Sequence, residues 1–204
     1  HKLDCMAMLA ELAPSASAVG AVNTIIVGAD GRLSGHNTDV LGIAGPAAAA
    51  IQGRTMLVVG SGGAARAGAA AARTCGAAAL FMLARNQAEA AAILAQTGLP
   101  GAVVPWGAPL PAGIGLLFNA TQLGMTGQPP LQVDLAPLPA DAVVFDAVYA
   151  PLETALLADA RARGLATIDG LAMLIGQAAE AFRLFYGAPA PRQHDDELRA
   201  LLTR

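Results

Sequence analysis

The sequence has little charge. Its 12 lysines and arginines and 15 aspartates and glutamates make up 13% of 204 residues, and the formal net charge is −3. A protein that binds nucleic acid through phosphates needs a basic face, so this balance argues against that class. No run of about 18 strongly apolar residues exists either, because glycine, proline or a charge interrupts every candidate. We therefore predict no nucleic-acid partner and no membrane-spanning segment.

Cysteine and histidine are also sparse. Cys5 and Cys75 lie far apart and neither belongs to a Cys-x-x-Cys pair, so we expect both to be reduced and structural, as in a cytoplasmic protein. The three histidines are scattered without metal-ligand spacing, and no metal is predicted. The sequence shows no secretory signal pattern. It begins at His1 and not at a methionine, so we expect a processed product or part of a longer protein.

Short apolar runs alternate regularly with alanine-rich helical patterns. Apolar runs without polar alternation suit strands covered on both faces, as in a parallel sheet. Strands are predicted at 55–59, 78–83, 114–119, 142–148 and 166–169, and helices at 64–74, 87–96, 153–163, 170–186 and 193–202. The stretch 103–111, rich in proline and glycine, is predicted to be a loop.

This alternation predicts an α/β fold with a Rossmann-type, doubly wound parallel sheet and a partial second lobe. Residues 1–45 do not follow the rhythm and are assigned to the remainder of the second lobe. Residues 46–170 form the nucleotide-binding domain, and residues 171–204 are helices that return to the second lobe. In the long helix, helical spacing predicts a buried stripe of Leu171, Leu174, Ile175, Ala178, Phe182 and Phe185.

A glycine-rich turn follows the first strand of this sheet. Gly60-x-Gly62-x-x-Ala65 matches the dinucleotide fingerprint, with alanine in the third place. Gly60 permits a tight turn, Gly62 lets the backbone approach a pyrophosphate, and the following helix supplies free N–H groups. The predicted phosphate loop consists of Gly60, Ser61, Gly62, Gly63 and Ala64. The alternative is a strand–helix turn without a ligand.

The end of the second strand of the sheet indicates which dinucleotide binds. An NAD site normally has an acidic residue there for the ribose hydroxyls. Here the sequence reads Leu83-Ala84-Arg85-Asn86-Gln87, with no acid before Glu89. Arg85 can pair with a 2′-phosphate through charge-assisted hydrogen bonds. NADP is therefore the predicted cofactor, and the alternative for Arg85 is a solvated arginine at a helix start.

Several further motifs occur in order along the chain. They are His1-Lys2, GAVNT at 20–24, GHNTD at 35–39, GSGGAARA at 60–67, NATQLGM at 119–125, DAVY with Pro151 at 146–151 and DGLAMLIGQAAEAF at 169–182. Together they closely resemble the shikimate dehydrogenase family, from Lys2 to Gly187. The resemblance implies an NADP-dependent enzyme of aromatic amino-acid biosynthesis that interconverts 3-dehydroshikimate and shikimate. A quinate or aminoshikimate dehydrogenase and a non-catalytic NADP-binding protein are the alternatives.

The resemblance also implies roles for single residues. Lys2 matches the lysine of the family's PHK motif, its catalytic acid/base, and Asp39 matches the aspartate that pairs with this lysine. The residues that match substrate-binding positions are Asn23, Tyr149 and Gln177. Those that match cofactor positions are the phosphate loop, Ala84, Arg85 and Asn86, together with Ala147 and Gly170 beside the nicotinamide.

The chemistry of the implied reaction suits these residue types. A buried cyclic polyol needs a ring of amides, hydroxyls and carboxylates, because each unpaired polar group costs about 1–3 kcal/mol. Asn23, Asp39, Tyr149 and Gln177 form such a set, and Lys2 is the expected proton acceptor. Taken singly, each residue has a simpler explanation. Lys2 could be a frayed terminal lysine, Asn23 a turn residue, Asp39 a helix N-cap, Tyr149 a core residue and Gln177 a polar residue on a helix flank.

The sequence departs from the family pattern in two relevant ways. The segment that precedes the family's PHK motif, which builds most of the substrate lobe, is not present, so we expect a shortened chain. Ala84 stands where NADP-using members commonly have asparagine. The expected partner is a small molecule, and the enzyme is expected to be a cytoplasmic monomer or homodimer.

Overall fold

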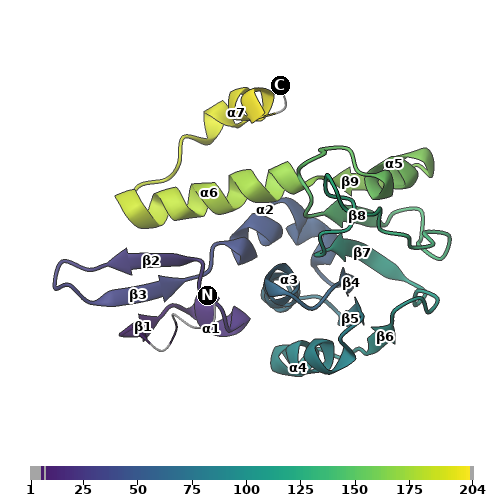
Figure 1. Cartoon of the computed structure of the whole chain (residues 1–204), viewed down its shortest axis with the longest axis horizontal. Helices are drawn as coiled ribbons and strands as arrows, with labels where there is room; N and C mark the ends of the chain where they lie inside the picture. The colour runs from purple at the N-terminus through teal and green to yellow at the C-terminus, as the bar shows by residue number, and fades with distance from the viewer. Residues whose placement is uncertain (1–5, 7, 203–204) are drawn as a thin grey trace.

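Two sheets and the helices around them make up residues 6 and 8–202, which the computed structural model describes (Figure 1). The elements, in chain order, are β1 (Glu11–Leu12), α1 (Pro14–Val19), β2 (Thr24–Val27), β3 (Leu33–His36), α2 (Asp39–Ile51), β4 (Thr55–Val59), α3 (Gly63–Thr74), β5 (Ala79–Ala84), α4 (Gln87–Thr97), β6 (Val103–Pro105), β7 (Ile114–Asn119), β8 (Val143–Asp146), α5 (Ala155–Ala162), β9 (Ala166–Ile168), α6 (Gly170–Tyr186), the 3₁₀ turn η2 (Arg192–His194) and α7 (Asp195–Leu202). No helix in this part of the chain is long and apolar enough to cross a membrane.

The larger sheet is parallel throughout and has the strand order β6-β5-β4-β7-β8-β9. Alternate side chains of its strands pack on opposite faces. Met56 and Val58 join a core with α2, α3 and α4, whereas Leu57 and Val59 join a core with α5. Both faces are therefore buried, which explains the continuous apolar runs and confirms the predicted α/β, Rossmann-type fold.

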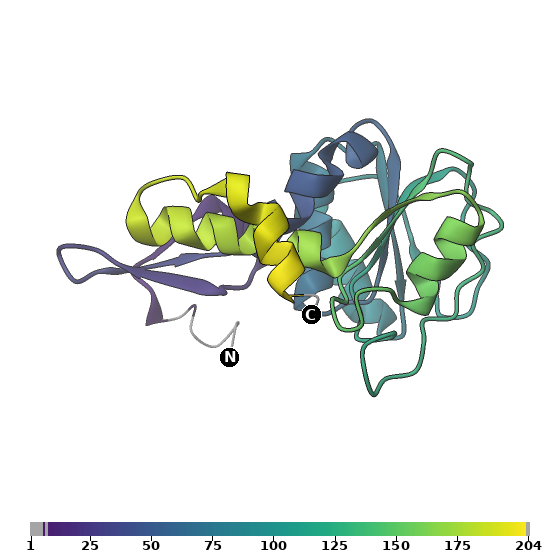
Figure 2. The same cartoon turned by 90° about the horizontal axis from the view of Figure 1, so that it is seen from above.

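The smaller sheet has the order β1-β3-β2, with β2 antiparallel and β1 parallel to β3. Seen from above, it lies at the opposite end of the molecule from the larger sheet, and α6 runs from one toward the other (Figure 2). Helix α2 begins directly after β3 and leads into β4 of the larger sheet. The two sheets are thus joined by α2 in the chain and by the packing of α6 against it in space.

Small residues bring α2 and α6 close together. A Cβ atom added at Gly42 would lie 2.7 Å from the carbonyl oxygen of Met173 and 3.1 Å from Cβ of Gln177. A Cβ atom at Gly176 would lie 3.1 Å from Cα of Gly42. Only glycine fits at this crossing, and the contact fixes the first turns of α2 beside the middle of α6.

One local prediction was wrong and another was only partly confirmed. Residues Val103–Pro105 form the edge strand β6, which pairs with β5 from Met82 to Ala84. A proline is tolerated there because an edge strand has one free side. On α6, Leu171 and Ile175 of the predicted stripe are buried, but Phe185 is 58% exposed and Ala178 is also exposed. Met173 is buried instead. The buried stripe is rotated toward α2 because the glycine crossing sets the contact face.

The structure describes one of the two cysteines. Cys75 is a free cysteine, and burial raises the pKa of its thiol. Cys5 lies outside the described residues.

Candidate active site

The two polar clusters at the ends of β2 and β3 meet in space. Asn23, just before β2, donates from Nδ2 to Asp39 Oδ1 at 2.9 Å and to Thr38 Oγ1 at 3.1 Å. Its Oδ1 atom accepts the backbone N–H of Thr38 at 2.9 Å. Thr38 and Asp39 are only 3% and 6% exposed. A single amide therefore holds the turn that starts α2 and orients the carboxylate of Asp39.

Asn37 secures the same turn from the other side. Its side chain donates to the carbonyl of Ala21 at 3.0 Å and accepts the backbone N–H of Asp39 at 3.1 Å. Its own backbone N–H donates to Ser15 Oγ at 3.1 Å. Asp39 is the first residue of α2, where a carboxylate is favoured by the helix dipole, but Thr38 occupies the N-cap position. The alternative of Asp39 as a helix N-cap is therefore wrong.

Gln177 lies on α6 at the glycine crossing. It is half-buried, and its Cβ faces Gly42, which is one helical turn after Asp39. The packing of α2 on α6 thus places three of the predicted substrate-binding side chains, Asn23, Asp39 and Gln177, around the start of α2. Lys2 lies outside the described residues.

A cleft of about 720 Å³ opens at the carboxyl ends of the strands of the larger sheet. This is where open α/β sheets bind their ligands. The predicted residues that line it are Gly60, Ser61, Gly62, Gly63, Ala64, Arg85, Asn86, Ala147 and Tyr149. Gly170 and Ala84 are not among the lining residues, and Ala84 is buried in β5 with 1% exposure.

The glycine loop has the geometry that a pyrophosphate requires. Gly60 has φ +111°, and a Cβ atom there would lie 3.1 Å from the side chain of Thr121. Nothing lies within 4 Å of where a Cβ would stand at Gly62 or Gly63, so backbone faces open space. Gly62 is the N-cap of α3, and no side chain caps this helix. Its first N–H groups are available to an anion, so the loop fits a dinucleotide.

Arg85 and Asn86 border the cleft after β5. Arg85 is exposed, and Asn86 caps α4 by accepting the backbone N–H of Glu89 at 3.1 Å. Asn86 is thus the N-cap of α4. Arg85 is the charged side chain among the residues that line the cleft.

A buried polar network shapes the far side of the cleft. Asp146 and Asn119, both 0% exposed, end β8 and β7, and Asn119 Nδ2 donates to Asp146 Oδ1 at 2.9 Å. Asp146 also accepts from Val148 N at 3.0 Å and from Thr154 Oγ1 at 2.7 Å. Burial raises the pKa of the Asp146 carboxyl, although these three hydrogen bonds oppose the shift. The network fixes the chain from Ala147 to Tyr149.

Helix α6 begins against this segment. A Cβ atom at Gly170 would lie 2.4 Å from the carbonyl oxygen of Ala147, so only glycine permits the approach. Asp169 caps α6 by accepting Ala172 N at 3.2 Å and forms an ion pair with Arg199 of α7. Burial raises the pKa of Asp169, but the hydrogen bonds from Arg199 and Ala172 outweigh it, and the pKa lies below its ordinary value.

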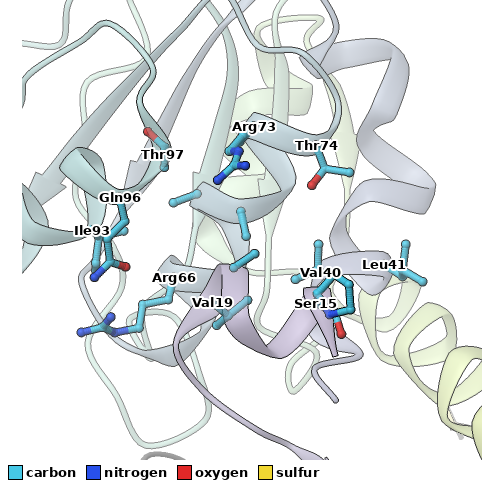
Figure 3. A pocket seen from close by; sticks show the side chains of 14 residues that line it. Ser15, Val19, Val40, Leu41, Arg66, Arg73, Thr74, Ile93, Gln96 and Thr97 are labelled. Carbon is cyan, nitrogen blue, oxygen red and sulfur yellow. The ribbon is translucent and has the colours of Figure 1, made fainter. Parts of the chain in front are cut away.

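A second pocket, of about 350 Å³, lies among α1, α2, α3 and α4 (Figure 3). Its apolar wall includes Val19, Val40 and Ile93, and its polar side chains include Arg66 and Arg73. None of the residues predicted from the sequence to be functional lines it.

Some residues at the site were missed by sequence reasoning. Thr38 bonds to Asn23, and its place in the NTD motif was the available signal. Trp106, 39% exposed, lines the cleft directly after β6, a strand that the sequence did not reveal. Met125, the last residue of the NATQLGM motif, also lines the cleft.

Comparison with known proteins gives consistent matches. The family described as shikimate 5′-dehydrogenase C-terminal domain matches residues 170–195. The shikimate dehydrogenase (NADP(+)) of Sphingopyxis alaskensis is 50% identical over 203 residues, which cover 99% of this chain and 74% of that protein.

Solved structures agree with this match. Shikimate 5-dehydrogenase from Thermus thermophilus, in complex with NADP(H) and shikimate, has a TM-score of 0.81 and 34% identity over 98% of this chain and 75% of its own. The ligand-free 5-ketofructose reductase of a Gluconobacter strain has a TM-score of 0.88 and 32% identity, and the match covers 98% of this chain and 76% of its own.

Proposed function

This chain belongs to the shikimate dehydrogenase family, and we propose that it is an NADP-dependent oxidoreductase that interconverts 3-dehydroshikimate and shikimate. The observation that carries this function is the hydrogen-bonded pair of Asn23 and Asp39. Asp39 stands one helical turn before Gly42, which faces Gln177 of α6, and the glycine loop opens into the strand-end cleft. The reaction belongs to the biosynthesis of aromatic amino acids.

The cleft residues suit NADP. The backbone N–H groups at Gly62, Gly63 and Ala64 would hold the pyrophosphate, with Ser61 at the rim, and Arg85 would pair with the 2′-phosphate. Ala84 and Asn86 would fix the position of Arg85 from both sides. Ala147 and Gly170 would border the nicotinamide, where the close contact between them leaves little freedom. When bound, the cofactor accepts or supplies the hydride.

The substrate would lie beside the start of α2. We assign its hydroxyl groups to Asn23, Asp39, Gln177 and Tyr149. Because Asn23 and Asn37 fix the turn that carries Asp39, its carboxylate is oriented before the substrate arrives. This reduces the entropy lost on binding. Tyr149, 56% exposed at the cleft, would approach from the cofactor side.

We assign proton transfer to Lys2, on the strength of its match to the PHK lysine. A base within hydrogen-bond reach of the reacting hydroxyl must take its proton during oxidation. In reduction, the ammonium group returns a proton to the forming alkoxide. The Asp39 carboxylate would hold this ammonium by charge attraction.

Initial rates with shikimate, quinate and an aminoshikimate, each with NADP and with NAD, test the function through the absorbance of the reduced nicotinamide. The proposal expects the highest kcat/KM with shikimate and NADP. A higher value with another polyol would identify a paralogue, and cofactor binding by calorimetry without turnover on any polyol would identify a non-catalytic protein. Lys2→Ala should reduce kcat far more than NADP affinity.

We also propose a division of the chain into a substrate-lobe remainder (residues 1–45), an NADP-binding domain (46–170) and returning C-terminal helices (171–204). The separate three-stranded and six-stranded sheets support it. We further propose that the enzyme is cytoplasmic and either a monomer or a homodimer, which light scattering after size-exclusion chromatography would distinguish. The free Cys75 is compatible with a reducing compartment.

A further inference from the structure

An ion pair joins the first turns of the two helices that flank the cofactor cleft. Arg66 of α3 pairs through its guanidinium with the carboxylate of Glu89 of α4. The Arg66 side chain is 17% exposed and that of Glu89 is 37% exposed. In Figure 3 the guanidinium lies on the same side of the pocket as Ile93 and Gln96 of α4, far from Val40 and Leu41. The arginine therefore reaches across to α4.

Glu89 stands close to the edge that selects the dinucleotide. Its backbone N–H is bonded to the side chain of Asn86, which lines the cleft next to Arg85. Glu89 does not itself line the cleft, but it stands four residues after Arg85 in the first turn of α4. A carboxylate and a phosphate repel each other because both are negative. NAD sites instead use an acid near the end of this strand to bind the hydroxyls of an unphosphorylated ribose.

We propose that Arg66 is a specificity-determining, positioning residue: by pairing with Glu89, it removes an opposing negative charge from the 2′-phosphate subsite and so favours NADP over NAD. The inference rests on the proposed use of NADP. With Arg66 in place, the formal charge of Arg66, Arg85 and Glu89 together is positive. Without Arg66, the two remaining charges cancel, and the attraction for the 2′-phosphate is lost.

A purely structural role for the pair, holding α3 against α4, predicts a different result. Both dinucleotides use the same glycine loop, so a displaced α3 would weaken NADP and NAD alike. By contrast, loss of the charge that neutralises Glu89 affects only the dinucleotide that carries the 2′-phosphate. The ratio of the two dissociation constants therefore separates the two roles.

The test is a double-mutant cycle with Arg66→Met, Glu89→Gln and the double variant, with NADP and NAD affinities measured by calorimetry. Methionine keeps much of the apolar stem. We expect Arg66→Met to raise the Kd of NADP about 5- to 20-fold, with a change in the Kd of NAD below about twofold. Glu89→Gln alone should preserve the preference for NADP over NAD. The double variant should regain the preference that Arg66→Met loses. Equal losses for both dinucleotides, or no restoration, would overturn the inference.

Two controls sharpen the result. Arg73→Met removes the same charge from the same helix, two turns later, and should leave the NADP/NAD ratio unchanged. The loss caused by Arg66→Met should also shrink at high salt, because screening weakens the repulsion from Glu89. Binding is measured without turnover, so failure of the inference is separate from failure of the proposed reaction. Wild-type protein that binds NADP but oxidises no polyol would contradict only the reaction.

Discussion

The amide of Asn23 donates a 2.9 Å hydrogen bond to the carboxylate of Asp39, although the two residues lie 16 positions apart in the chain. The antiparallel pairing of β2 and β3 is the cause, since Thr24 pairs with His36 and brings the two strand ends side by side. The short hairpin thus converts two distant sequence clusters into one polar site at the start of α2.

Replacement of Asp39 by asparagine should separate chemistry from cofactor binding. The variant keeps the size of the side chain but removes the charge proposed to hold the Lys2 ammonium. We expect kcat for shikimate oxidation to fall about 10²- to 10³-fold, with NADP affinity nearly unchanged. The matched control is Asp30→Asn, in the exposed turn between β2 and β3, where the side chain accepts the backbone N–H of Arg32. Equal losses of turnover in both variants would refute the role of Asp39.

Arg85→Ala should lower the preference for NADP. Removal of charge-assisted hydrogen bonds to a 2′-phosphate predicts a rise in the Kd of NADP of about 10- to 100-fold, with little effect on NAD. Calorimetry with both dinucleotides measures the ratio. Arg163→Ala, an exposed arginine at the end of α5, serves as the control. An unchanged ratio for Arg85→Ala would remove the electrostatic explanation of cofactor choice.

The sequence predicts the larger sheet well because each of its central strands is covered on both faces. Strands β4 and β7 have the predicted bounds, since their side chains are apolar at nearly every position. The edge strand β6 was missed because three residues ending in proline carry no such pattern. Pairing with β5, a tertiary contact, stabilises it.

The candidate site was less accessible to sequence reasoning. The motifs gave the residue types, and the resemblance gave their roles, but neither gave the contacts. The hydrogen bond between Asn119 and Asp146 joins the ends of two strands and depends on the register of β7 with β8. The pairing of Arg66 with Glu89 likewise depends on how α3 and α4 flank β5. Such long-range contacts have no local sequence signature.

Stability should depend on pH through the ion pair of Asp169 with Arg199. The pKa of Asp169 is lower in the folded protein than its unfolded value of about 3.9. The pair therefore stabilises the fold above that value, and this contribution is lost as the pH falls through the lower, folded-state pKa. Arg199→Met should reduce the melting temperature at pH near 7 and have progressively less effect as the medium is acidified below about pH 4.

Asp169→Asn provides the matching control for this titration. The amide oxygen can still accept the Ala172 N–H that caps α6, but the group no longer ionises. In the Asp169→Asn background, the effect of Arg199→Met on the melting temperature should be small and independent of pH. If Arg199→Met alone lowers the melting temperature equally at neutral and acidic pH, the ion pair of Asp169 with Arg199 is not the source of the pH dependence. Circular dichroism during heating provides the measurement.

The crossing of α2 and α6 predicts a sharp difference between two glycines of one helix. A Cβ atom at Gly42 would lie 2.7 Å from the backbone oxygen of Met173, whereas nothing lies within 4 Å of one at Gly45. Gly42→Ala must push α6 away, at a cost of about 1–3 kcal/mol in the free energy of unfolding. Because Asp39 and Gln177 flank this contact, the KM for shikimate should rise as well.

Gly45→Ala is the control, and its effect on stability should stay below about 1 kcal/mol in either direction. Alanine favours the helix more than glycine does, but the following Pro46 restricts a residue that carries a Cβ atom. Urea unfolding, together with the KM values for shikimate and NADP, compares the two variants. If Gly42→Ala lowers stability while the KM for shikimate stays at the wild-type value, the position of α6 does not govern the substrate site.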